Sequence, residues 1–153
     1  MVFSKTNFST IKKITVGNKE VKKLKKDALY RIPLLAEIEN EIFPNKTPVS
    51  SQKVDNHLIV YSVNDKPILF SLPTQQICPH LMLVLQYPDL LPAVYVDEGA
   101  VKAVLKKDGA TKLMAPGIKQ APQDFEVGDI VAVRLLEHEE AFAIGIAMQS
   151  SKD

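Results

Sequence analysis

The sequence predicts an α+β fold made of two small domains, a mixed α/β domain followed by a small β-barrel that carries one principal helix. Three observations predict it. Helical and strand-like periodicities are interleaved along the chain, a connector with two prolines interrupts them at residues 87–92, and 153 residues suffice for two small domains. We therefore expect domains over residues 1–88 and 89–153.

The first domain should begin with a strand and a helix. Residues 8–16 place isoleucine and valine among serine, threonine and lysine, which favours a strand, and the Gly17-Asn18 pair ends it. Residues 19–32 then carry Val21 and Leu24 at the start of a pattern with close to helical spacing. A single helix should cover this range.

A second helix and a hairpin should follow. Residues 34–43 show another helical stripe, and Pro33 either interrupts the first helix or starts the second. Residues 45–51 are expected to form a loop. Strands over residues 54–63 and 67–72 are joined by a polar Asn-Asp-Lys connector, which has the composition of a hairpin turn. Pro79 would then occupy the first turn of a helix that ends near residue 86.

The second domain should contain short strands around one helix. Asp97 is placed to cap that helix, and the glycines at the ends of elements favour a closed or half-closed barrel. The strands are expected over residues 93–96, 110–114, 130–135 and 141–148, and the helix over residues 97–107.

The net charge of +1 hides an uneven distribution. Residues 1–26 hold eight lysines and one glutamate, a balance of +7, whereas the other 127 residues hold 11 bases and 17 acids, a balance of −6. A basic end favours contact with an anionic partner. A solvated lysine face that keeps a helix soluble would give the same pattern.

The composition argues against several classes of protein. The apolar stretches at residues 81–85 and 90–96 are far shorter than the ~20 residues of a membrane span, and residues 1–14 show no secretory signal. Cys78 is the only cysteine, so it forms neither an internal disulfide nor a cysteine-based zinc site. We expect a cytoplasmic protein with no membrane association.

Four motifs identify the second domain by resemblance. Their sequences are VDEGAVKAVL at residues 96–105, GATKLMAPGI at 109–118, GDIVAV at 128–133 and AIGIA at 143–147. In this order and spacing they resemble the PUA domain, named for pseudouridine synthases and archaeosine transglycosylases. The PILF and YPDLLP motifs of the first ninety residues resemble the pre-PUA domain of translation factors of the ligatin and malignant T-cell-amplified sequence type.

The resemblance implies an RNA-binding surface on the helix and the adjacent strand. The residues that would form it are Gly99, Ala100, Lys102, Ala103, Lys106, Thr111, Lys112, Met114, Pro116 and Gly117. It also implies that the basic segment adds affinity for ribosomal RNA or for a protein surface, through Lys12, Lys13, Lys22, Lys23 and Lys26.

The residues themselves allow structural alternatives. Gly99 lets a backbone approach a phosphate closely, or it relieves packing against the neighbouring strand. Lys102 and Lys106 lie on one helix face and could both meet a nucleic-acid backbone, or they are ordinary solvated lysines. Thr111 could orient a base or satisfy β propensity, and Met114 belongs either to an apolar shelf or to the core.

Two features depart from the family pattern. Residues 92–153 hold seven bases and ten acids, so an RNA contact there must be a local patch. Domains of this family usually continue past the region that corresponds to residues 146–148 with a further strand, whereas this sequence ends at residue 153. We expect a barrel with one exposed strand edge, which a partner or a second copy would cover.

Catalytic and cofactor motifs are absent from the sequence. There is no glycine-rich phosphate loop, and the three histidines are scattered. The run Cys78-Pro79-His80 suggests a nucleophile whose pKa a helix start would lower, although a structural role is simpler. The adjacent carboxylates of Asp97 and Glu98 fit helix capping better than acid–base chemistry. We expect no enzyme activity, no metal and no cofactor.

These observations leave three functional hypotheses. The first is a non-catalytic protein of the translation machinery that binds structured RNA, either tRNA or rRNA, in association with the small ribosomal subunit. The second is a protein-interaction module that docks a translation-factor partner through the pre-PUA domain. The third is a stand-alone enzyme, which would require a deep pocket lined by titratable groups.

Overall fold

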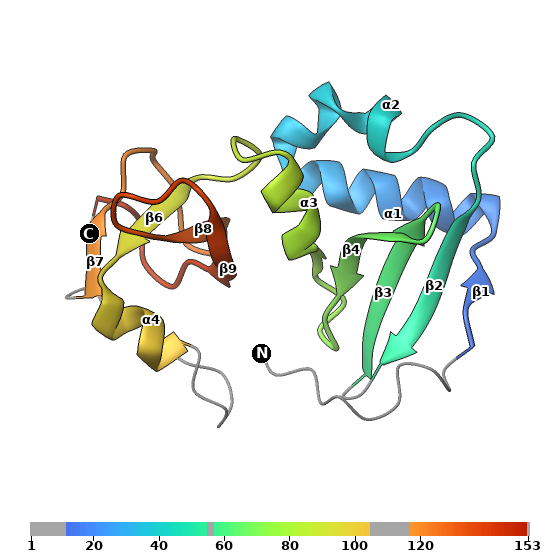
Figure 1. Cartoon of the computed structure of the whole chain (residues 1–153). Coiled ribbons are helices and arrows are strands. Elements are labelled where there is room, and N and C mark those ends of the chain that lie inside the picture. Colours follow the sequence, from blue (N-terminus) through green and yellow to red (C-terminus); the bar gives the residue numbers. More distant parts are fainter. Residues whose placement is uncertain (1–11, 55–56, 105–116, 153) are drawn as a thin grey trace. The chain divides into compact units, whose positions relative to one another are not determined.

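The computed structural model describes residues 12–54, 57–104 and 117–152, with side chains at all of these positions except 103 and 104. The chain divides after Leu90 into two compact units, and each is described by itself (Figure 1). The α+β class expected from the sequence is confirmed, because helices and two sheets are interleaved along the chain.

The N-terminal unit is a five-stranded antiparallel sheet with helices. In chain order its elements are β1 (Ile14–Thr15), α1 (Asn18–Arg31), the 3₁₀ helix η1 (Pro33–Glu37), α2 (Glu39–Ile42), β2 (Val49–Val54), β3 (Leu58–Val63), β4 (Lys66–Ser71), β5 (Ile77–Pro79) and α3 (Leu81–Gln86). The strands lie in the order β1-β2-β3-β4-β5, so each strand pairs with the next one along the chain.

The turn between β3 and β4 confirms the predicted hairpin. Asn64 and Asp65 have φ values of 51° and 62°, the left-handed conformation that a two-residue turn requires at both positions. Asparagine and aspartate adopt this conformation at lower cost than most residues. The hairpin brings Tyr61 opposite Leu69 and Val60 opposite Phe70.

Helix α1 packs on the sheet through a narrow stripe. Leu24 and Ala28 are buried, and Ala28 has no exposed surface at all. The small side chain of Ala28 allows the helix backbone to approach the β5 edge, which α1 contacts. The helix ends at Ile32, whose N–H donates to the carbonyl of Ala28 (2.8 Å), because Pro33 cannot continue the ladder.

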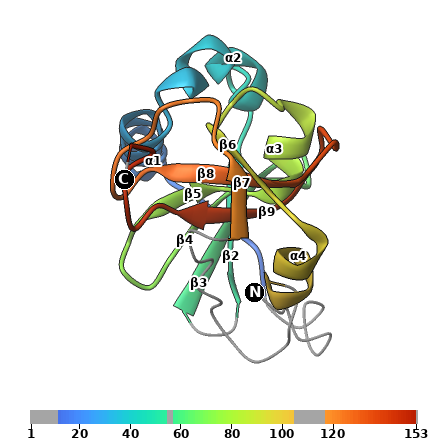
Figure 2. The same cartoon turned by 90° about the vertical axis from the view of Figure 1, so that its left-hand side faces the viewer.

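The C-terminal unit is a four-stranded sheet with one helix. Its elements are β6 (Ala93–Val96), α4 (Glu98–Val104), β7 (Ile118–Gln120), β8 (Ile130–Leu135) and β9 (Ala141–Ile146), and the strand order is β7-β6-β8-β9. Strands β6 and β8 run parallel, with Ala93 opposite Ala132 and Val96 opposite Leu135. Figure 2 shows that α4 leaves directly from the end of β6.

Alternate residues of β6 and β8 form the core of this unit. Val94, Val96, Val131 and Val133 are buried together on one face of the sheet, with Ala100 of α4 among them. On the other face Tyr95 and Arg134 are register partners, and the guanidinium donates to the tyrosine hydroxyl over 3.1 Å. This hydrogen bond helps to offset the cost of holding a largely buried charge.

Several predicted elements differ from the structure. The second helix is a 3₁₀ turn and a single α turn, because Ile38 interrupts the ladder between them with φ −119° and ψ 11°. The expected loop over residues 45–51 is wrong at its end, where Val49 begins β2. Strand β2 has four polar residues out of six and is stabilised by pairing with β3 rather than by its own hydrophobicity.

Pro79 was expected in a helix and lies in strand β5 instead. It pairs opposite Leu69 at the edge of the sheet, a position where proline is tolerated because no neighbour needs its missing N–H. His80 caps α3 in its place, since its Nδ1 accepts a hydrogen bond from the N–H of Met82 (3.2 Å).

The expected strand over residues 110–114 lies outside the described residues. The structure adds β7, which the sequence did not predict, next to β6. Within the described strands, β7 and β9 form the two edges of the sheet. None of the helices in the described ranges is long and apolar enough to span a bilayer.

Two neighbouring leucines test the N-terminal core. Leu35 is completely buried, whereas Leu34 is 47% exposed. We expect Leu35→Ala to lower the free energy of unfolding by about 2–5 kcal/mol, because it leaves a cavity. Leu34→Ala should change it by about 0.5 kcal/mol or less. Urea unfolding followed by circular dichroism measures both, and equal effects would contradict the assignment of the core.

Candidate nucleic-acid interface

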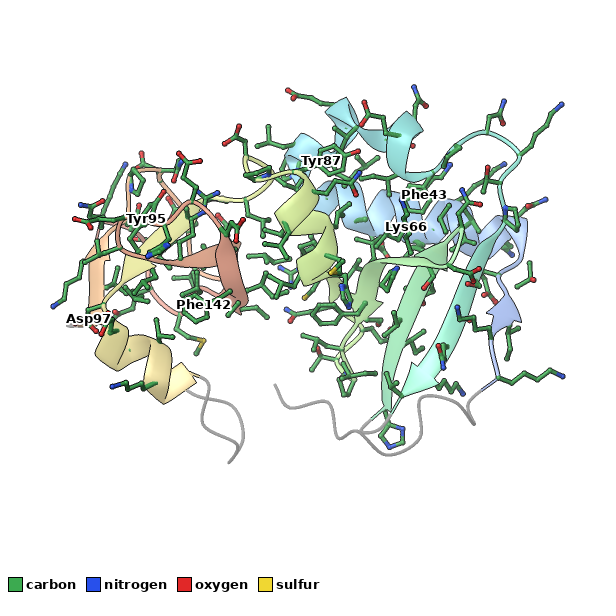
Figure 3. All side chains as sticks on the ribbon, viewed as in Figure 1. Phe43, Lys66, Tyr87, Tyr95, Asp97 and Phe142 are labelled. Carbon is green, nitrogen blue, oxygen red and sulfur yellow. The ribbon has the colours of Figure 1, made fainter. Side chains whose placement is uncertain are left out.

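The start of α4 is fixed by a capping carboxylate. Asp97 Oδ1 accepts a hydrogen bond from the N–H of Ala100 (2.9 Å), and its backbone carbonyl accepts from the N–H of Val101 (3.1 Å). The predicted N-cap is therefore confirmed. Lys119 of β7 places its Nζ 3.6 Å from Asp97 Oδ2, so the same carboxylate links the helix to the edge strand. Figure 3 shows Asp97 at this junction.

These contacts favour the charged form of Asp97. The backbone N–H of Ala100 is the main cause that lowers the pKa of its carboxyl group, and Lys119 and the N–H of Gly99 lower it further. The cap uses the N–H of Ala100, and the side chain of Ala100 is buried in the core. Of the predicted RNA-binding residues, Ala100 thus serves the fold of α4.

Gly99 and Lys102 lie on the outer surface of α4. Both are exposed, and a Cβ built at Gly99 would meet, among the described residues, only Asp97 Oδ1, at 3.4 Å. Described packing against the neighbouring strand therefore does not require glycine at this position. Lys102 lies in the last turn of the helix, where a cation is favourable.

Only two of the remaining predicted residues of this surface lie in the described part of the chain. Ala103 belongs to α4 by its backbone, and Gly117 is half-exposed directly before β7. Lys106, Thr111, Lys112, Met114 and Pro116 lie outside the described residues.

The predicted basic residues of the N-terminal unit are all exposed. Lys22, Lys23 and Lys26 lie on α1, and Lys12 and Lys13 precede β1. Lys13 pairs with Asp65 at 3.2 Å, with both side chains largely in solvent. Such an exposed pair contributes little to the free energy of unfolding.

Two further lysines of the basic segment were not among the predicted contact residues. The Nζ of Lys25 lies 5.2 Å from the centre of the Phe43 ring, so Lys25 packs against the unit. Lys19 is exposed and falls on the same face of α1 as Lys22, Lys23 and Lys26. Tyr30, which is 85% exposed, lies at the end of that face. Lys19 and Tyr30 could have been found from the sequence, because they lie three, four or seven residues from the other lysines of this face.

Cys78 does not fit a nucleophile. It lies buried in β5, and burial raises the pKa of its thiol to about 11, although Arg31 acts in the opposite direction. The expectation that it stands at a helix start with a lowered pKa is wrong, because Pro79 belongs to the strand. Within the described residues, no group of three or more histidine, cysteine, aspartate or glutamate side chains could hold a metal ion.

Comparisons with known proteins agree with the motifs. Residues 4–88 match the Pre-PUA-like domain and residues 92–153 match the PUA domain. The chain is 35% identical to a Malignant T-cell-amplified sequence 1 homolog of Dictyostelium discoideum over 85% of this chain and 72% of that protein. It is 31% identical to Translation machinery-associated protein 20 of Saccharomyces cerevisiae over 85% of this chain and 73% of that protein.

A solved structure supports the same assignment. A hypothetical protein from Pyrococcus horikoshii superposes with a TM-score of 0.73 at 30% sequence identity, over 92% of this chain and 84% of that one. The resemblance expected from the sequence motifs is confirmed.

The cap of α4 predicts a pH dependence. A lowered pKa of Asp97 in the folded state means that its contribution to stability is present above the ordinary carboxyl pKa of about 3.9 and is lost as the pH falls through the lower folded value. We expect Asp97→Asn to lower the thermal midpoint at pH 6, with the difference from the unmodified chain vanishing near pH 2. Asp89→Asn, at an exposed carboxylate, is the control, and an equal effect there would contradict a special role for Asp97.

The burial of the Cys78 thiol predicts that it is alkylated slowly. We expect iodoacetamide at pH 7.5 to alkylate the single cysteine slowly in the folded chain and completely after unfolding in urea, because a protonated and covered thiol is a poor nucleophile. Mass spectrometry measures the fraction modified over time. Fast alkylation of the folded chain would contradict the burial of Cys78.

Proposed function

This chain belongs to the family of proteins that join a Pre-PUA-like domain to a PUA domain, and from that premise we propose that it is a non-catalytic RNA-binding protein of the translation machinery. The name of its yeast relative, Translation machinery-associated protein 20, supports a role in translation. The domains we propose cover residues 1–88 and 89–153. The protein would act in the cytoplasm, with structured RNA, either tRNA or rRNA, and the small ribosomal subunit as partners.

The observation that carries the proposal is that some residues of α4 stabilise the fold while others remain exposed on its surface. Ala100 packs into the core, and Asp97 fixes the start of the helix against β7. Gly99 and Lys102 are left on the surface, where no contact with the described residues of the unit explains them. An exposed glycine beside an exposed lysine suits close approach of a sugar–phosphate backbone.

The charge of the C-terminal unit bears on the kind of RNA bound. A domain with more acids than bases does not bind RNA strongly through electrostatics alone. We therefore propose that this surface selects a structured RNA by shape and by a few backbone contacts. The wider set of residues that we propose for it adds Ala103, Lys106, Thr111, Lys112, Met114, Pro116 and Gly117.

A second candidate is a protein-interaction module. Leu34, Met82 and Leu85 of the N-terminal unit are between 41% and 58% exposed, and a docked partner would cover such apolar side chains. Under this alternative the N-terminal unit docks a translation-factor partner, and the chain binds little RNA by itself.

Charge reversal on the helix tests the first candidate. We expect the double variant Lys102→Glu and Lys106→Glu to weaken binding to tRNA or small-subunit rRNA by roughly tenfold or more, because two attractive contacts with phosphates become repulsive. Gel-shift titrations at several salt concentrations measure the affinity and its salt slope. Crosslinking to RNA in cells measures the same loss in the natural setting.

The control for this experiment is Lys152→Glu, which reverses one exposed charge in the same unit. It should leave the affinity nearly unchanged. If the unmodified chain, the double variant and the control variant recover equal amounts of RNA, the α4 surface is removed from the proposal. Absence of RNA binding by the unmodified chain, together with capture of a protein partner, would favour the second candidate.

A further inference from the structure

One face of α1 carries four lysines and an aromatic residue in a row. At about 100° per residue, Lys19, Lys22, Lys23, Lys26 and Tyr30 fall within an arc of roughly 100°. All five are exposed, whereas Leu24 and Ala28 on the opposite side are buried. We call the four lysines the lysine stripe.

No contact among the described residues of the unit explains the stripe. Among the described residues, none of the four lysines forms an ion pair with a carboxylate, in contrast to Lys13, Lys119 and Lys152. The stripe therefore keeps four like charges within about two turns of helix. Like charges three and four residues apart destabilise a helix slightly. An anionic ligand would turn this cost into binding energy.

Tyr30 lines an open hollow at the end of this face. The hollow has a volume of about 320 Å³ and is lined by Asp27, Tyr30, Arg31, Thr74, Gln75, Gln76 and Ile77. It forms because α1 packs against β5, which brings the last turns of the helix next to the turn between β4 and β5. The hollow therefore belongs entirely to the N-terminal unit.

The turn between β4 and β5 presents amide side chains to this hollow. Its backbone is closed by hydrogen bonds from the N–H of Gln75 to the carbonyl of Leu72 (2.8 Å) and from the N–H of Leu72 to the carbonyl of Gln76 (2.9 Å). Gln75 has φ 68°, a conformation that glycine or asparagine adopts at lower cost. Glutamine at this position gives the turn a long donor and acceptor group on the surface.

From this arrangement we infer that α1 and the β4–β5 turn form a binding site for an unpaired nucleotide of RNA. The inference rests on the proposed RNA-binding function and names a second contact, on the other unit. The lysine stripe holds the phosphates, the ring of Tyr30 stacks on the base, and the hollow receives the edge of the base.

The hollow offers both hydrogen-bond acceptors and donors, which suits the edge of a base. Asp27 can accept a hydrogen bond from the N–H groups that every base carries on its pairing edge, and the guanidinium of Arg31 can donate to the oxygen or nitrogen acceptors of that edge. Thr74 and Gln75 add donors and acceptors. In a duplex that edge is already paired, so the site should discriminate for single strands, loops and bulges.

The dimensions of the helix suit a short single strand. Lys19 and Lys26 are separated by about 10 Å along the axis, and Tyr30 lies about 6 Å further on. Phosphate contacts thus precede the stacking position along one line. The stripe would give affinity that falls with salt, and Tyr30 would give affinity that does not.

Fluorescence anisotropy with a labelled eight-nucleotide RNA tests this site. We expect Tyr30→Leu to weaken binding roughly tenfold, within the range measured for base stacking on aromatic residues, and Tyr30→Phe to bind like the unmodified chain because it keeps the ring. The double variant Lys22→Gln and Lys26→Gln should reduce the salt slope by about 1.4. Lys53→Gln and Lys66→Gln, at exposed lysines of the strands, are the matched controls.

A second readout reports stacking directly. The sequence contains no tryptophan, so Tyr30→Trp introduces a single indole at the site. We expect the RNA to quench its fluorescence, whereas the same RNA should leave the indole of Met82→Trp, at a side chain that is 58% exposed on α3, nearly unchanged. Equal quenching of both indoles would overturn the stacking role of Tyr30.

The outcomes separate this site from the proposed function. If the unmodified chain binds RNA and the charge reversal on α4 weakens it, while the Tyr30 and stripe variants bind normally, the function stands and this site is overturned. If the unmodified chain binds no RNA, both fail. If the stripe variants lose an acidic protein partner but keep their affinity for RNA, the face is a protein-docking surface and the inference is overturned.

Discussion

The close packing of α1 against the β5 edge is the contact on which the N-terminal unit and its surface depend. Ala28 is completely buried at this contact, and Ile32 and Leu35 continue the buried line beyond the end of the helix. Because this line is narrow, the opposite face of α1 can carry lysines without loss of core. The same approach places the last turn of α1 beside the β4–β5 turn.

The elements that the sequence predicted well are those whose local signal agrees with their tertiary role. Helix α1 has apolar residues at helical spacing, and β6 and β8 are nearly continuous apolar runs, as expected for strands buried on both faces. The hairpin of β3 and β4 was predicted from the Asn-Asp turn. Strands β2, β5 and β7 were missed because two of them have three residues and the other is mainly polar, so only pairing with neighbours defines them.

The candidate surfaces were predictable to a different degree. The cap at Asp97 followed from its position before a helical pattern, and the structure confirms it. The salt bridge between Lys119 and Asp97 could not be predicted, because it depends on the pairing of β7 with β6. No local sequence pattern indicates that pairing. Ala100 was chosen for its place in a motif, and only the packing of α4 reveals that it faces the core. Tyr30 was not predicted from the sequence. Its exposure in the structure identified it first, and the spacing of the lysines then showed that it shares their face of α1.

The distribution of charge now has a physical interpretation. A C-terminal unit with excess acid cannot hold RNA tightly by electrostatics, and four lysines on one helix give affinity without selectivity. Two weak sites on one chain raise each other's effective concentration when both can reach the same RNA. Under our proposals the lysine stripe would supply attraction, Tyr30 would add a preference for unpaired nucleotides, and the α4 surface would select a structured RNA. Strengthening the stripe alone would hold the protein on any RNA, and strengthening the α4 surface alone would leave binding dependent on a rare match. Under these proposals, keeping the two roles on separate surfaces would make binding both selective and reversible.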